Sequence, residues 1–181
     1  MKQLYFGFLL MLVLLQACGS RTVSNEYSVG TNEYDTTASE DGIQRMSPYH
    51  YSDTIRTNGK AYVYTIHREA SDSLPVVTDD EGNKYADNVY TLSIRQGGQT
   101  VFNRQFTKKT VASYLSKDFQ QNGILDGMMC DKSLPGLRFA ISVSLPQSDM
   151  FEPLLLQVDT YGGMTISRDE RGEAELEDEG V

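Results

Sequence analysis

The stretch LRFAISVSL, residues 137–145, decides the fold of this chain. Its apolar residues recur at strict two-residue spacing: Leu137, Phe139, Ile141, Val143 and Leu145. Small or polar residues fill the alternate positions: Arg138, Ala140, Ser142 and Ser144. Alternation with a period of two predicts a β-strand that buries one face. The strongest local signal in the chain therefore indicates a domain built from sheets.

The same alternation occurs on both sides of this stretch. In KAYVYTIHRE, residues 60–69, every second residue from Tyr62 to Ile66 is apolar, and the pattern returns from Tyr90 to Ile94. Gly97 and Gly98 then offer a two-residue hairpin turn before a strand over 100–107. Further strands are predicted at 124–130, 154–159 and 164–167.

One segment between these strands has a helical period instead. In KTVASYLSKDFQQNG, residues 109–123, the apolar residues are Val111, Tyr114, Leu115 and Phe119. Their spacing predicts one helix over about Val111 to Gln121, capped by Thr110 and ended by Asn122-Gly123. The expected fold is therefore α+β and mostly β. We expect an antiparallel meander of about seven strands, curled or barrel-like, that packs against this helix.

The beginning of the chain indicates where in the cell the protein is located. Lys2 precedes an uncharged apolar run, Leu4 to Leu15, which as a helix of about 18 Å is too short for the roughly 30 Å hydrocarbon core of a bilayer. Such a run is typical of a signal peptide. It ends in Leu15-Gln16-Ala17-Cys18, which resembles a bacterial lipobox. The resemblance implies removal of residues 1–17 and lipid attachment to Cys18, where two or more acyl chains give stable anchoring.

Composition divides the rest of the chain into three parts. Residues 18–52 are rich in Ser, Thr, Asn, Asp and Glu, which predicts a disordered tether after the lipidated cysteine. Residues 53–167 form the single globular domain, and residues 168–181 an acidic tail. The tether and its exit carry four tyrosines: Tyr27, Tyr34, Tyr49 and Tyr51. They are either ordinary linker residues or a docking strip for a partner or for the domain itself.

The second half of the chain resembles a known family. The matching pieces include ILDGM at 124–128, PQSD at 146–149, Pro153 and SRDE at 167–170. Over Ile124 to Glu170 the chain is similar to the carboxy-terminal half of a family of Bacteroidetes lipoproteins of unknown function. The resemblance implies no activity, but it agrees with the lipobox. Because no acidic stretch follows Cys18, the resemblance implies a protein that faces the periplasm.

Charge and motif content exclude several classes of function. The chain has 16 basic and 25 acidic residues, a net charge of −9, which disfavours nucleic acid as a partner. The two histidines, His50 and His67, and the thiol of Cys130 lack the spacing of metal ligands, so we expect no metal site and no cofactor. The acidic loop at 76–88 lacks both anchoring carboxylates of an EF-hand. Cys130, which follows Met128 and Met129, is predicted to be a core residue.

No catalytic motif is present. The chain has no G-x-S-x-G sequence and no glycine-rich phosphate loop after a strand. Its carboxylates could converge only by tertiary folding, and the candidates are Asp126, Asp131, Asp149 and Glu152. We therefore expect no catalytic residues and a protein that is not an enzyme.

The loop LPQSDMFEPLLL, residues 145–156, carries the candidate partner-binding residues. Met150 and Phe151 are apolar residues in a polar loop, and Asp149 and Glu152 flank them. They either tuck under the sheet or contact a partner, because binding residues are often carried on loops held by a rigid scaffold.

The expected protein is a monomeric, non-catalytic lipoprotein of the bacterial cell envelope, anchored through Cys18 and facing the periplasm. It would bind an envelope protein or peptide. The first alternative is a carrier of a small apolar ligand in a cavity of the curled sheet. The second is an enzyme with a carboxylate-based site.

Overall fold

The computed structural model describes residues 34–35 and 39–171. The expected signal peptide, Cys18 and most of the expected tether lie outside the described residues, as do residues 172–181 of the acidic tail. Within the described residues, no helix is long and apolar enough to cross a membrane.

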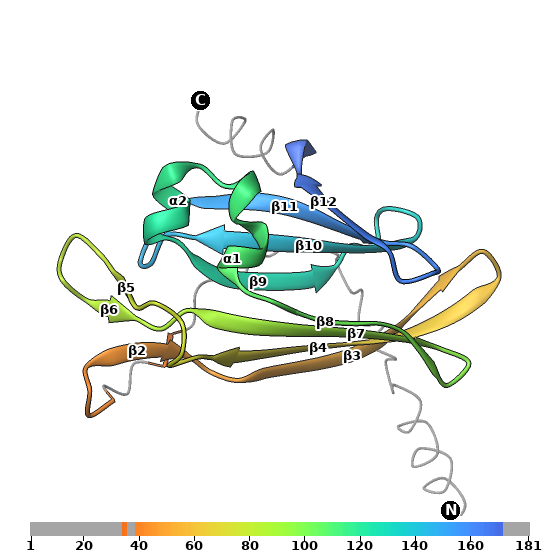
Figure 1. Ribbon diagram of the computed structural model, residues 1–181, viewed down its shortest axis with the longest axis horizontal. Helices are drawn as coiled ribbons and strands as arrows, with labels where there is room; N and C mark the ends of the chain where they lie inside the picture. The colour runs from red at the N-terminus through yellow and green to blue at the C-terminus, as the bar shows by residue number, and fades with distance from the viewer. Residues whose placement is uncertain (1–33, 36–38, 172–181) are drawn as a thin grey trace, which may run out of the picture.

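Two four-stranded antiparallel sheets form the body of the protein. The first sheet has the order β3-β4-β7-β8 and the second β12-β11-β10-β9. The first consists of β3 (Tyr49–Thr57), β4 (Lys60–Ala70), β7 (Asn88–Gln96) and β8 (Gln99–Phe106). The second consists of β9 (Ile124–Cys130), β10 (Leu137–Ser144), β11 (Phe151–Val158) and β12 (Met164–Arg168). The mostly β, antiparallel fold expected from the sequence is confirmed (Figure 1).

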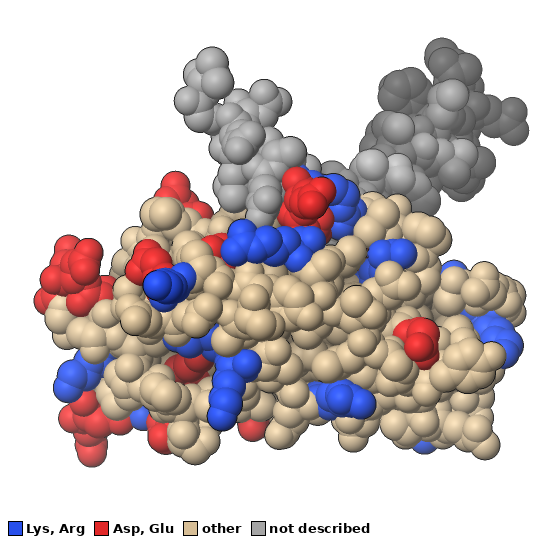
Figure 2. All heavy atoms as spheres, turned by 45° about the horizontal axis from the view of Figure 1, so that its top comes forward, with Lys and Arg blue, Asp and Glu red and all other residues tan. Residues whose placement is uncertain are grey.

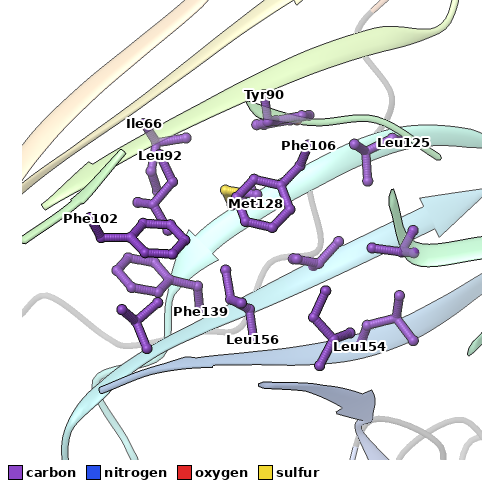
Figure 3. Packing of buried hydrophobic residues seen from close by; sticks show 14 of the residues in the cluster. Ile66, Tyr90, Leu92, Phe102, Phe106, Leu125, Met128, Phe139, Leu154 and Leu156 are labelled. Carbon is purple, nitrogen blue, oxygen red and sulfur yellow. The ribbon is translucent and has the colours of Figure 1, made fainter. Parts of the chain in front are cut away.

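The core lies between the two sheets. Tyr64 of β4 meets Phe139 of β10 edge-to-face, with ring centroids 5.4 Å apart. Figure 3 shows side chains from both sheets meeting in one layer, with Ile66 and Leu92 on one side and Phe139 and Leu156 on the other. The alternating apolar residues seen in the sequence form this layer because successive side chains of a strand point to opposite faces.

The strands form two stacked sheets rather than one curled sheet. Each sheet is a meander of sequential strands, and neither closes on itself. The helical segment between β8 and β9 separates the two meanders in the chain and carries it from an edge of the first sheet to an edge of the second. Each sheet has one apolar face, formed by alternate residues of its strands. Stacking the two sheets buries these two apolar faces against each other.

The helical segment is broken rather than continuous. The single helix expected over Val111 to Gln121 is instead α1 (Lys108–Val111), a 3-10 turn (Ala112–Tyr114) and α2 (Lys117–Asn122). Leu115 and Ser116 adopt extended conformations, with ψ of 149° and 164°, and so interrupt the helix. The apolar residues Val111, Leu115 and Phe119 nevertheless lie in the core, as their spacing predicted.

A small third sheet flanks one end of the body. Its order is β1-β2-β6-β5, with β1 (Tyr34–Asp35), β2 (Ile43–Met46), β5 (Val77–Thr78) and β6 (Lys84–Tyr85). Met46, Val77 and Tyr85 form a separate buried cluster with Ile124. β2 and the first residues of β3 lie inside residues 18–52, the segment expected to be a disordered tether. Strand structure therefore begins before Asp53.

Candidate functional site

A buried polar cluster fastens the first sheet to the edge of the second. The carboxylate of Asp87 accepts the main-chain N–H of Leu125 at 2.9 Å, and the side-chain amide of Asn88 donates to the carbonyl of Leu125 at 3.0 Å. Both contacts lie at the N-terminal end of β9, next to the N-terminal end of β7. Side chains at the start of β7 and just before it therefore satisfy main-chain groups of β9, an edge strand of the second sheet.

Asp126 is the centre of this cluster. Its main-chain carbonyl accepts hydrogen bonds from the Tyr90 hydroxyl and from the guanidinium of Arg68. Its carboxyl accepts a hydrogen bond from the hydroxyl of Ser142, at 2.8 Å, and another from the hydroxyl of Ser144. Burial raises the pKa of Asp126 to about 6, against the lowering effect of the two serines.

Two further titratable groups of the cluster are perturbed by burial. Burial raises the pKa of Asp87, which the backbone N–H groups of Leu125 and Asn88 partly oppose. Burial lowers the pKa of Lys108, whose ammonium donates to the carbonyl of Gly123 at 2.6 Å. Lys108 thereby ties the start of α1 to the residue that follows α2. The hydrogen bonds of Asp87 and Lys108 thus connect separate strands and helices of the fold.

The candidate partner loop is divided between exposed and structural residues. Met150 is 55% exposed and Asp149 is also exposed. Phe151 is half-buried and pairs with Ser144 as the first residue of β11. Both carboxylate oxygens of Glu152 accept the main-chain N–H of Ser116, at 2.9 and 3.2 Å. Glu152 therefore braces the break in the helical segment, and only Met150 and Asp149 are well placed for a partner.

The candidate carboxylates have separate partners. Asp131 forms an ion pair with Arg171 at 2.8 Å, while Asp126 and Glu152 make the contacts given above. Within the described part of the chain, no three side chains of the His, Cys, Asp and Glu types gather as a metal site. Cys130 is half-buried beside Tyr64, and burial raises the pKa of its thiol.

Two tyrosines of β3 form an exposed aromatic ledge, which we define as Tyr49 and Tyr51. Their rings stack with centroids 6.4 Å apart, and they are 41% and 40% exposed. Tyr49 pairs with Arg68 and Tyr51 with Ile66 in the register of β3 and β4. Because paired residues share a face, the aromatic ledge lies on the face that carries the core, at the sheet edge where the second sheet leaves it partly uncovered.

Polar contacts hold the surroundings of the aromatic ledge. The guanidinium of Arg68 lies 5.7 Å from the ring centroid of Tyr49 and donates to the carbonyl of Ser47 at 2.9 Å. Asp53, further along the same face of β3, pairs with Lys132 at 2.5 Å, just after β9. Figure 2 shows that on one face of the molecule charges of both signs are scattered over a largely uncharged surface.

Comparison with known proteins assigns the family. Residues 30–166 match the model of a domain of unknown function, DUF4738. The chain belongs to this family. The DUF4738 region extends from before β2 into β12, so it includes the aromatic ledge, the polar cluster and the Met150 loop. No curated protein matches the chain.

The DUF4738 assignment confirms that the chain belongs to a family of unknown function. The aromatic ledge had a partial signal in the sequence, since Tyr49 and Tyr51 stand at two-residue spacing. The polar cluster had none, because Asp87, Tyr90 and Asp126 meet only through the stacking of the sheets.

Proposed function

We propose that this protein is a non-catalytic lipoprotein of the bacterial cell envelope that binds an extended segment of another envelope protein or peptide along β3. The observation that carries the proposal is the aromatic ledge: two stacked, half-exposed tyrosines on the core-side face of an edge strand. Stacked tyrosines supply a large contact area at low cost in side-chain entropy, and they are enriched at protein interfaces.

The backbone of β3 supports the same proposal. This strand has nine residues, and among the described strands it pairs only with β4. An edge strand has N–H and C=O groups that an added strand can pair with, while alternate side chains provide specificity. An extended segment added here would place its own side chains beside Tyr49 and Tyr51.

The proposed location in the cell envelope is supported by the sequence. The apolar run that ends at Cys18 supports lipid attachment, and the absence of an acidic stretch after Cys18 supports a periplasm-facing orientation. The similarity to Bacteroidetes lipoproteins supports the same address. A lipid anchor would hold the domain near the membrane, where envelope proteins are available as partners.

The alternatives have less support. A carrier of an apolar ligand needs an internal cavity, whereas apolar side chains from both sheets meet in the space between them (Figure 3). An enzyme needs carboxylates that face substrate, whereas Asp126 and Glu152 are engaged by internal donors. The exposed side chain of Met150 provides a second contact surface for a protein partner.

Site-specific photo-crosslinking in cells tests the proposal. A crosslinker at position 51 should capture a discrete envelope protein, and Tyr49→Ala should weaken the capture. A crosslinker at position 161 is the matched control, because Tyr161 is 96% exposed in the turn between β11 and β12, next to β8 at the opposite edge of the first sheet from β3. A third probe at position 150 tests the Met150 loop.

The outcomes separate the possible contact surfaces. Capture at 51 and not at 161 supports binding along the aromatic ledge. Capture at 150 alone would move the contact to the Met150 loop, and capture at none of the three positions would contradict partner binding by either surface. Thermal unfolding of Tyr49→Ala should match that of the wild type, so that loss of capture reports on contact rather than on folding.

A further inference from the structure

The two histidines of the chain lie directly opposite one another on neighbouring strands. The chain contains only these two, and the register pairs His50 of β3 with His67 of β4. Their ring centroids are 5.9 Å apart, with an interplanar angle of 62°. The next pair along this face is Ser52 with Thr65, so the histidines stand beside small uncharged side chains.

Both imidazoles can be reached from solvent. They lie on the face of the first sheet that points away from the core, because the residues that alternate with His67, such as Ile66, are buried. His50 is exposed and His67 half-buried. Glu69 lies two residues further on the same face, with its Oε1 3.4 Å from Nε2 of His67. A carboxylate therefore stands next to the pair of imidazoles.

We propose that His50 and His67 together bind a divalent transition-metal ion of the class that prefers imidazole, with Cu²⁺ favoured over Zn²⁺. Water fills the remaining coordination positions, and the carboxylate of Glu69 lies beside the pair, with its Oε1 3.4 Å from Nε2 of His67. The proposed site is an open surface site with two imidazole ligands. Within the described residues, no group of three His, Cys, Asp or Glu side chains could hold a metal ion.

The distance between the rings fits this chemistry. A metal ion lies about 2.0–2.1 Å from each imidazole nitrogen that binds it. The centres of two imidazoles that share a metal ion are therefore about 5 to 6.4 Å apart, and the observed 5.9 Å falls in that range. Imidazole ligands suit copper, zinc and nickel, whereas Mg²⁺ and Ca²⁺ require oxygen ligands. Affinity for a given site rises to Cu²⁺ along the first-row series.

Metal binding here would link β3 to β4. Any ion that binds the folded and not the unfolded protein stabilises the fold in proportion to the logarithm of its concentration over its Kd. The linked strand is the one that carries the aromatic ledge on its other face. The two proposals are tested separately, because the metal titration uses the purified chain without a partner and the histidines lie on the opposite face of β3 from the aromatic ledge.

Titration of the purified full chain with Cu²⁺ tests the site. Cys18→Ser and Cys130→Ser are introduced into every sample so that thiols do not bind copper. We expect one Cu²⁺ per chain by calorimetry, with electron paramagnetic resonance showing two imidazole nitrogens as ligands. His50→Gln and His67→Gln should each weaken binding by at least about tenfold. Thr65→Gln, on the same strand and face, should leave the affinity unchanged.

Three results would overturn the proposal: no saturable binding below millimolar Cu²⁺, equal loss of affinity in Thr65→Gln, or an unchanged Cu²⁺ affinity in either histidine variant. Far-ultraviolet circular dichroism of each variant shows that the loss does not come from unfolding. Zn²⁺ should bind more weakly than Cu²⁺ at the same residues, and saturable Mg²⁺ binding that depends on either histidine would contradict the proposed ligand preference.

Discussion

The hydroxyl of Tyr90 in the first sheet donates a hydrogen bond to the main-chain carbonyl of Asp126 in the second. Tyr90 is buried, and Asp126 is on an edge strand whose outer main-chain groups would otherwise lack strand partners. The contact thus joins the two sheets at a point where apolar packing alone would leave a buried carbonyl with fewer donors.

Tyr90→Phe should destabilise the fold by about 1 to 2 kcal/mol, because a buried carbonyl loses a donor while the ring remains in place. The carbonyl of Asp126 keeps only its longer contact with Arg68, at 3.3 Å. Urea unfolding measures the change. Tyr161→Phe is the control, since Tyr161 is 96% exposed and its substitution should stay within about 0.5 kcal/mol. Equal stability of the two variants would show that the bond contributes nothing.

Asp126 should make the stability of the protein depend on pH. Because burial raises its pKa from 3.8 to about 6 in the folded state, the folded protein holds a proton that the unfolded chain releases. Its contribution is therefore fully present below about pH 4 and is lost as the pH rises through 6. Asp126→Asn should remove this slope, worth roughly 3 kcal/mol. Urea unfolding of both proteins between pH 4 and 7.5 checks this, and parallel profiles would refute it.

Gly127→Ala should destabilise the protein by about 1 to 3 kcal/mol through steric overlap. A Cβ at position 127 would stand 2.1 Å from the Oγ of Ser142, which holds the carboxyl of Asp126. Ser142→Ala removes the atom that clashes. The double variant should therefore lose less stability than the sum of the two single losses, and strictly additive losses would show that the clash is not the cause.

Glu152→Ala and Met150→Ala should separate the structural and exposed residues of one loop. Glu152 accepts the main-chain N–H of Ser116, so its removal should cost about 1 to 2 kcal/mol. Met150 is exposed, so Met150→Ala should change the free energy of unfolding by less than about 0.5 kcal/mol. A loss of stability in Met150→Ala would instead place Met150 among the residues that support the fold.

Cys18→Ala should abolish lipid attachment. Cells that produce the wild-type chain should incorporate radiolabelled palmitate into it, and the variant should carry no label, because the thiol is the proposed site of the diacylglycerol. Cys130→Ser provides the matched control and should remain labelled. Label that persists in Cys18→Ala would show that the anchor assignment is wrong.

The strand content could be predicted from the sequence because burial of one sheet face leaves a period of two in the residues of a single strand. Leu137 to Leu145 shows it most clearly, and the predicted hairpin at Gly97-Gly98 is present between β7 and β8. The inward residues of the helical segment, Val111 and Phe119, were also predicted, since their positions follow from local spacing. The exposure of Met150 could not be predicted, because a loop side chain has no period.

The sequence by itself determined the alternating strands, their buried faces and the apolar run that ends at Cys18, because each of these is written in neighbouring residues. Only the tertiary structure decided that the strands form two sheets, that Glu152 braces the break at Ser116, and that His50 faces His67. These relationships join residues that are distant in the chain. They arise when the two sheets bury their apolar faces against each other and strand register aligns separate segments, which no local pattern of residues encodes.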